Sequence, residues 1–247
     1  MDPIECIHRG DFESFKRAVD AHDYQPSTTF DTKGATALMW SAGCGNLEMT
    51  RYLIEYCGCD PSQPQRGKRR GFAGRTAFHW ACRNGNLDIV RYLLTSKTAT
   101  TSGSNKKGTV LLEAKTQDGT TAFGLACWQR HLHVMEFLYQ NGCDIHALNS
   151  FGCSPVLWCS QGTHGDGLVA LQWLYDKGCE ISLINHNGHG ILHKSAQRGQ
   201  QNVAEWFVTK QFAGVISSST ENDNNSNSIS TKQRENILTL IGPDNEG

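Results

Sequence analysis

Residues 74–82 read Gly74-Arg-Thr-Ala-Phe-His-Trp-Ala-Cys82, and close copies of this stretch recur along the chain. Most copies share a Gly, a Thr or Ser two residues later, a short apolar run and a small residue. The copies begin at Gly34, Gly74, Gly119, Gly152 and Gly188, so their spacings are 40, 45, 33 and 36 residues. Self-similarity at a period of about 20 to 50 residues is the signature of a repeat architecture. The sequence therefore predicts a stack of similar units.

Each copy is followed by a pattern that predicts a pair of helices. In the second copy, Gly85-Asn86 marks a sharp reversal after the first helix, and Leu87–Leu94 then carries apolar residues at helical spacing. The second helices are expected over residues 47–54, 87–94, 132–139, 168–175 and 203–208.

The shortest spacing, 33 residues, and an opening similar to Thr-Pro-Leu-His resemble the ankyrin repeat. The copies differ from this pattern in places. Only the fourth copy has the proline, as Pro155, and only the second and fifth copies have the histidine, as His79 and His193. The resemblance covers residues 31–210, with a partial match over 4–24. It implies an all-α ankyrin-repeat solenoid of stacked helix-turn-helix units with β-turn or hairpin loops.

Three regions are expected along the chain. Residues 1–30 form an N-terminal capping partial repeat, 31–213 the solenoid, and 214–247 a Ser/Asn-rich disordered tail. Whether Ile237–Ile241 in the tail docks on the last repeat is left open. The five repeats lie near residues 31–65, 71–100, 116–148, 149–184 and 185–213. Inserted loops are expected near residues 61–75 and 97–110, and they lengthen the period by about 7 and about 12 residues.

Composition excludes several classes of protein. The formal net charge is −1, so no global basic field points to nucleic acid and no acidic excess points to disorder. The N-terminus lacks the pattern of a secretory signal, and no apolar run approaches the ~18 residues of a membrane span. We expect a soluble monomer without membrane association, in the cytoplasm and alternatively also in the nucleus.

Residues that recur in the same slot are interpreted as packing. Trp40, Trp80 and Trp158 share a slot of the first helix, and the second helix has an aromatic slot filled by Tyr52, Tyr92, Phe137, Trp173 and Trp206. Aromatic side chains bury large areas in cores, so we favour packing over a binding ladder. The ten cysteines are interpreted as reduced thiols, several of them in small-residue slots.

A basic loop is the most prominent charged feature. Arg66, Lys68, Arg69, Arg70 and Arg75 lie within ten residues. Three interpretations remain: a solvated loop, a contact for an acidic protein partner, and a nucleic-acid contact, which is the least favoured because no aromatic platform accompanies the patch.

No motif for chemistry was found. The sequence lacks a Gly-rich phosphate loop, a nucleophile elbow and a Cys-x-x-Cys pair, and no Glu follows His189 in a metalloprotease pattern. We expect no metal, no cofactor and no enzymatic activity.

The resemblance implies that the turn tips and the exposed ends of the first helices hold a partner on a concave face. The residues carried over are Arg75, Arg83, Asn84, Trp128, Gln129, Phe151, His189, Gln197 and Arg198. The expected function is a non-catalytic scaffold or adaptor that binds a protein, acidic in one interpretation, on this face and the basic loop. The alternative is a nuclear or nucleic-acid-associated regulator that uses Arg66–Arg75.

Overall fold

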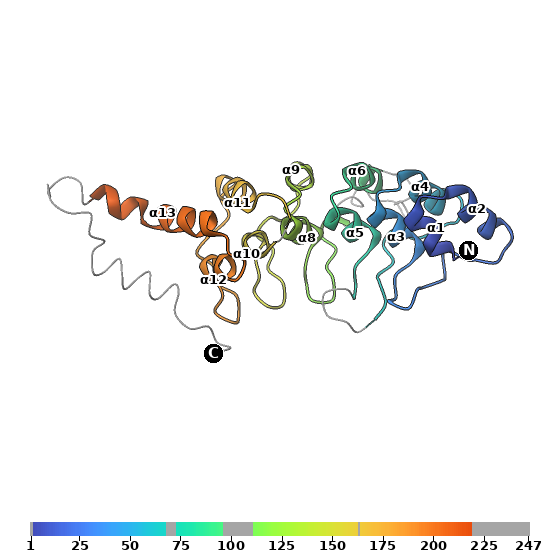
Figure 1. Cartoon of the computed structure of the whole chain (residues 1–247), viewed down its shortest axis with the longest axis horizontal. Helices are drawn as coiled ribbons and strands as arrows, with labels where there is room; N and C mark the ends of the chain where they lie inside the picture. The colour runs from blue at the N-terminus through green and yellow to red at the C-terminus, as the bar shows by residue number, and fades with distance from the viewer. Residues whose placement is uncertain (1, 68–72, 96–110, 163, 219–247) are drawn as a thin grey trace.

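The computed structural model describes residues 2–67, 73–95, 111–162 and 164–218. Its helices follow one another in pairs along an elongated stack (Figure 1). The pairs are α1 (Pro3–Arg9) with α2 (Phe12–Asp20), α3 (Ala37–Cys44) with α4 (Leu47–Glu55), α5 (Ala77–Arg83) with α6 (Leu87–Thr95), α8 (Ala122–Gln129) with α9 (Leu132–Gln140), α10 (Pro155–Gln161) with α11 (Gly167–Asp176), and α12 (Ile191–Gln197) with α13 (Gln201–Ser218).

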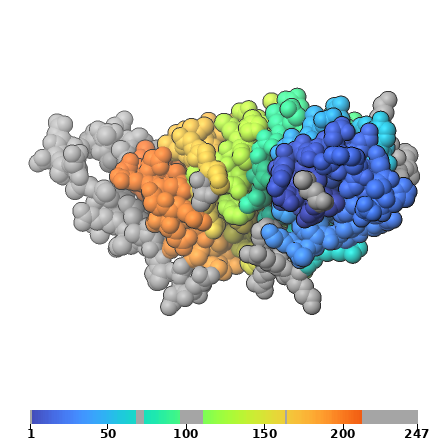
Figure 2. Space-filling view, turned by 45° about the vertical axis from the view of Figure 1, so that its right-hand side comes forward, coloured from blue at the N-terminus to red at the C-terminus, as the bar shows by residue number. Residues whose placement is uncertain are grey.

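The first helices of the pairs form one row and the second helices from α2 to α11 form another (Figure 1). Loops project from the first row on the side away from the second row (Figure 1). The pairs follow in chain order along one continuous body (Figure 2).

The recurring Thr or Ser explains where the first helices begin. The Thr36 side chain accepts a hydrogen bond from the Met39 N–H, and Thr121 and Ser154 cap α8 and α10 in the same way. Such an N-cap satisfies a backbone N–H that has no partner within the helix. The second helices contain every one of the ranges expected from the apolar spacing.

The core lies between the two rows of helices. Phe78 of α5 and Phe123 of α8 are completely or almost completely buried, as are Leu53 of α4 and Met135 of α9. Each helix pair closes its apolar face only against its neighbours, which makes the stack cooperative. Cys82 and Cys127 are buried free thiols in this core, and burial raises their pKa, in agreement with a packing role.

Neighbouring loops are joined by a repeated backbone hydrogen bond. The Arg66 N–H donates to the Gly34 carbonyl at 2.9 Å, and the Gln117 N–H donates to the Ala73 carbonyl at 3.0 Å. Two further bonds continue the row, from Ser150 to Asp118 and from His186 to Phe151, both at 2.9 Å. The loops therefore form a connected row beside the first helices.

The connections and the C-terminal end add detail to the expected organisation. Helix α13 continues to Ser218, so residues 214–218, which the sequence placed in the tail, are helical. The first inserted loop is partly ordered, since the Gln65 N–H donates to the Arg75 carbonyl at 2.6 Å. The loop at 97–110 and residues 219–247, which include Ile237–Ile241, lie outside the described residues.

No helix among the described residues is long and apolar enough to cross a membrane.

Candidate protein-binding surface

Two of the expected partner-binding residues meet across neighbouring repeats. Arg83 ends α5 and Trp128 lies in the last turn of α8. The Arg83 guanidinium carbon lies 5.2 Å from the centre of the Trp128 ring, a cation–π arrangement. Both side chains are half-buried, so each keeps part of its surface accessible.

Two pairs of tryptophan rings lie on the first helices, and one of them includes Trp128. Trp128 lies 5.9 Å from Trp158 of α10, and Trp40 of α3 meets Trp80 of α5 edge-on at 4.8 Å. We call Trp40, Trp80, Trp128 and Trp158 the indole row. Trp40, Trp80 and Trp158 pack against the core, as expected for the recurring Trp slot. All four rings are only partly buried.

Hydrogen bonds fix the two N-terminal rings of the indole row against the loops. The Trp40 Nε1 donates to the Asp31 carboxylate at 2.8 Å, and the Trp80 Nε1 donates to the Gln65 side-chain oxygen at 3.2 Å. Because Asp31 and Gln65 belong to the connecting loops, these rings lie in the corner between the loops and the first helices. We call this corner the inner face.

Three of the expected contact residues are buried. Arg75, Gln129 and His189 have only 4–9% of their surface exposed, so they are not available to a partner as the sequence analysis expected. The slot explains two of them: the residue after the turn Gly is buried in every repeat, as Ala35, Arg75, Thr120, Cys153 and His189. Small or apolar residues in that slot were the sequence signal for burial.

The remaining expected residues are exposed, and all except Asn84 are dispersed. The Arg83 Nη1 donates to the Asn84 side-chain oxygen at 3.2 Å. Phe151, 39% exposed, lies on the loop before α10, whereas Gln197 and Arg198 lie at the end of α12. Exposed Asn84 donates to the Gly43 carbonyl at 2.8 Å and so joins two repeats. The structure brings Arg83, Asn84 and Trp128 together and leaves Phe151, Gln197 and Arg198 apart from them.

The basic loop contributes less than its sequence suggests. Arg66 is exposed, and its guanidinium carbon lies 3.8 Å from the centre of the Phe30 ring. Arg75 is buried, and burial lowers its pKa to about 10. Lys68, Arg69 and Arg70 lie outside the described residues. Among the described residues, only Arg66 therefore presents this charge to a partner.

Trp40 and Trp80 contribute to this surface, although the sequence pattern assigned them to packing alone. One signal was present: Trp80 and Arg83 are three residues apart, as are Leu125 and Trp128. Residues at that spacing lie on one face of a helix. The recurring Trp slot, which Trp80 occupies, therefore lies on the same helix face as the expected contact slot, which Arg83 and Trp128 occupy.

The chain belongs to the ankyrin-repeat family. A sequence model of this family, described as ankyrin repeats (3 copies), matches residues 4–105 and 73–149. The all-α solenoid expected from the sequence is confirmed by this match and by the helix pairs. Ankyrin repeats generally mediate protein–protein interactions and are typically non-catalytic. A comparison with curated proteins gave no match.

Within the described part of the chain, no group of three or more His, Cys, Asp or Glu side chains is arranged to hold a metal ion.

Proposed function

We propose that the protein is a non-catalytic scaffold or adaptor that binds a protein partner on the inner face. The observation that carries this proposal is the indole row with Arg83 stacked on Trp128. Tryptophan and arginine are enriched among the residues that dominate binding energies at interfaces. Partly buried rings that are already held by hydrogen bonds lose little conformational entropy when a partner covers them.

The charges along the inner face favour a partner segment that combines apolar and acidic side chains. The Lys33 ammonium lies 5.9 Å from the centre of the Trp40 ring, and Arg83 covers Trp128. A carboxylate beside an apolar side chain would meet both the rings and these cations. The proposal locates this interaction in the cytoplasm, with the nucleus as the alternative compartment.

The nucleic-acid alternative is not adopted. Of the cluster Arg66–Arg75, Arg75 is buried and Arg66 already covers Phe30. An affinity for duplex DNA or RNA that falls steeply as salt rises would revive it.

The test is a comparison of captured partners between the wild-type chain and an Arg83→Ala/Trp128→Ala double variant. We expect the double variant to capture fewer partners than the wild type. Its affinity for a purified partner should fall about 30-fold or more, because the loss of a central interface residue costs about 2 kcal/mol. A Glu136→Ala variant is the matched control because Glu136 is exposed on α9, the second helix of the same repeat. Circular dichroism establishes that all three chains are folded. Equal capture by the double variant and the control would contradict the proposal.

A further inference from the structure

The second helices carry a repeated pairing of an aromatic ring with a cation. The guanidinium carbon of Arg51 on α4 lies 5.2 Å from the Tyr92 ring centre on α6, and that of Arg91 on α6 lies 4.8 Å from the Phe137 ring centre on α9. Towards the C-terminus, Lys177 covers Tyr139 at 5.1 Å and Lys210 covers Tyr175 at 5.2 Å. The outer aromatic surfaces of these repeats are thus covered by cations of the chain itself.

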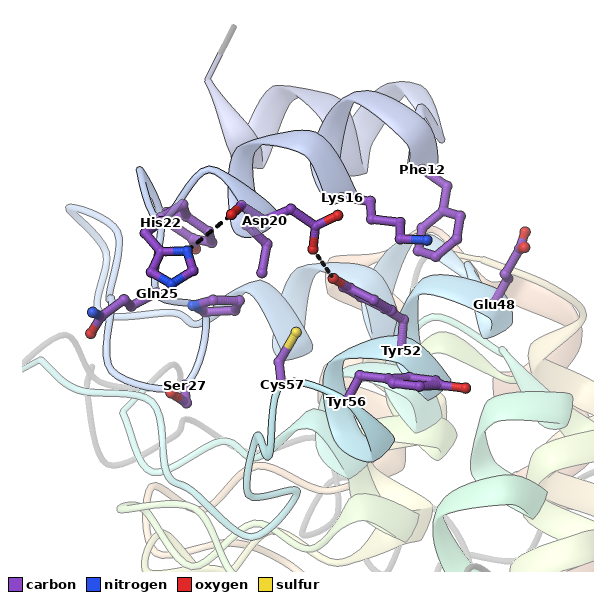
Figure 3. A pocket seen from close by; sticks show the side chains of 13 residues that line it. Phe12, Lys16, Asp20, His22, Gln25, Ser27, Glu48, Tyr52, Tyr56 and Cys57 are labelled. Carbon is purple, nitrogen blue, oxygen red and sulfur yellow. Dashed lines mark hydrogen bonds between the residues drawn. The ribbon is translucent and has the colours of Figure 1, made fainter.

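The first interface departs from this pattern. Tyr52 occupies on α4 the slot of Tyr92, and Lys16 on α2 occupies the slot of Arg51. Among the described residues, however, no lysine or arginine lies over the ring of Tyr52 or Tyr56. Lys16 lines the same cavity as Phe12, Tyr52 and Tyr56 (Figure 3).

Tyr52 and Tyr56 form an aromatic surface that remains open to solvent. Their rings stack with centres 5.6 Å apart, and Phe12 meets Tyr52 edge-on at 5.2 Å. Tyr56 is 80% exposed, although exposing so large an aromatic side chain has no benefit for folding. An exposed aromatic side chain next to a cavity is typical of a contact for another molecule.

The tyrosine pair borders a cavity of about 840 Å³ between α2, the 22–27 loop and α4 (Figure 3). Two carboxylates line it, Asp20 at the end of α2 and Glu48 in the first turn of α4. The Tyr52 hydroxyl donates to the Asp20 carboxylate at 3.5 Å. Burial, followed by the nearby Cys57 and Asp20, raises the pKa of Tyr52 to about 12, so the hydroxyl keeps its proton at neutral pH.

We propose that this outer groove, formed by Phe12, Asp20, Glu48, Tyr52 and Tyr56, binds an arginine side chain of a protein partner. The planar guanidinium stacks on tyrosine rings and donates to a carboxylate at its edge, and the groove provides both groups. The cation–π pairs at the following interfaces show that this chain already uses that contact. The site lies on the second-helix side of the stack, so it is separate from the inner face and does not depend on the function proposed for it.

The test uses an acetylated, amidated peptide of four Gly-Arg units as the probe and the full-length chain. Titration followed by NMR should shift the ring signals of Tyr52 and Tyr56. Tyr56→Ala should weaken binding about tenfold, as expected for a loss of ~1–2 kcal/mol from a cation–π contact. Because Tyr56 is so exposed, this substitution is expected to leave the fold intact. Lys16→Ala should strengthen binding, since it removes a competing cation that lines the cavity.

The matched control is Tyr139→Ala, an exposed tyrosine of the second-helix row that Lys177 already covers, and it should bind the peptide as the wild type does. Arg83→Ala should also bind normally, which separates this site from the inner face. A matched Gly-Lys peptide should bind more weakly, because a compact ammonium stacks poorly on rings. Undiminished binding to Tyr56→Ala would overturn the site, and equal binding of the Gly-Lys peptide would overturn its assignment to arginine.

Discussion

His79 illustrates how a single residue of the repeat pattern ties two repeats together. Its side chain is completely buried at the start of α5. The ring Nδ1 accepts from the Thr76 N–H at 3.2 Å, and Nε2 lies 3.0 Å from the Ala114 carbonyl of the next loop. The neutral ring with its proton on Nε2 satisfies both contacts. Burial is the main reason that the pKa of His79 is lowered to about 4.

This pKa predicts a loss of stability in mild acid. The unfolded chain takes up a proton on this residue near pH 6.5, while the folded chain does not until about pH 4. The contribution of the neutral His79 to the free energy of unfolding is therefore present above pH 6.5. It is lost as the pH falls towards 4, by up to about 3 kcal/mol. Urea unfolding at pH 7 and pH 4.5 measures the effect. In His79→Gln the difference in unfolding free energy between the two pH values should become smaller. His146→Gln changes an exposed histidine and should keep the wild-type difference. An unchanged pH dependence in His79→Gln would contradict the assignment.

At the scale of elements, the row of loops depends on close backbone approach. Gly34 has a φ of 75°, and a Cβ atom there would lie 2.0 Å from the Arg66 carbonyl oxygen. That position lies directly against the hydrogen bond that joins the two loops. Gly10 has a similar φ of 70°, but a Cβ atom there would meet nothing within 4 Å.

The two glycines therefore form a matched pair for mutation. Gly10→Ala should cost about 1–2 kcal/mol, the penalty for a left-handed backbone with a side chain. Gly34→Ala should cost a further ~1–3 kcal/mol, because the loops must also move apart. Chemical denaturation of both variants measures the difference. Equal destabilisation would show that the contact between the loops adds nothing to stability.

At the scale of the whole molecule, the stack is stabilised by contacts between neighbours, and Arg130 joins three repeats. It adopts the left-handed conformation, with a φ of 58°, where the first, second and fifth repeats use Gly45, Gly85 and Gly199. Its Nε donates to the Cys159 carbonyl at 2.8 Å, and its Nη2 donates to the Gln200 side-chain oxygen at 2.7 Å. The side chain therefore connects the end of α8 to α10 and to the residue that precedes α13.

Arg130→Gly should loosen the C-terminal part of the stack selectively. The glycine suits the backbone, so the substitution removes mainly the side-chain bonds, a loss of about 1–3 kcal/mol. In a repeat protein this loss is local, since each unit contacts only its neighbours. Amide hydrogen exchange should become faster in α10 to α13 and stay unchanged in α1 to α4. Arg17→Ala, which removes an exposed side chain bonded only within α2, is the control. A uniform change along the chain would contradict the local role of Arg130.

Local features of the sequence determined the elements of this protein. Thr36, Thr121 and Ser154 mark helix starts because an N-cap needs only the next three residues. The apolar spacing of Leu87–Leu94 predicts a helix because its period is that of the helix itself. Recurrence of these signals was sufficient to predict the stack and its family.

The tertiary structure alone decided which side chains form surfaces. It buried Arg75 and His189 inside the loop row, and it stacked Arg83 on Trp128, although these two residues belong to different repeats. It also left the ring of Tyr56 open where later repeats cover their rings with cations. The physical reason is that these contacts depend on the distance and rotation between neighbouring repeats, and no short-range pattern in the chain encodes that geometry.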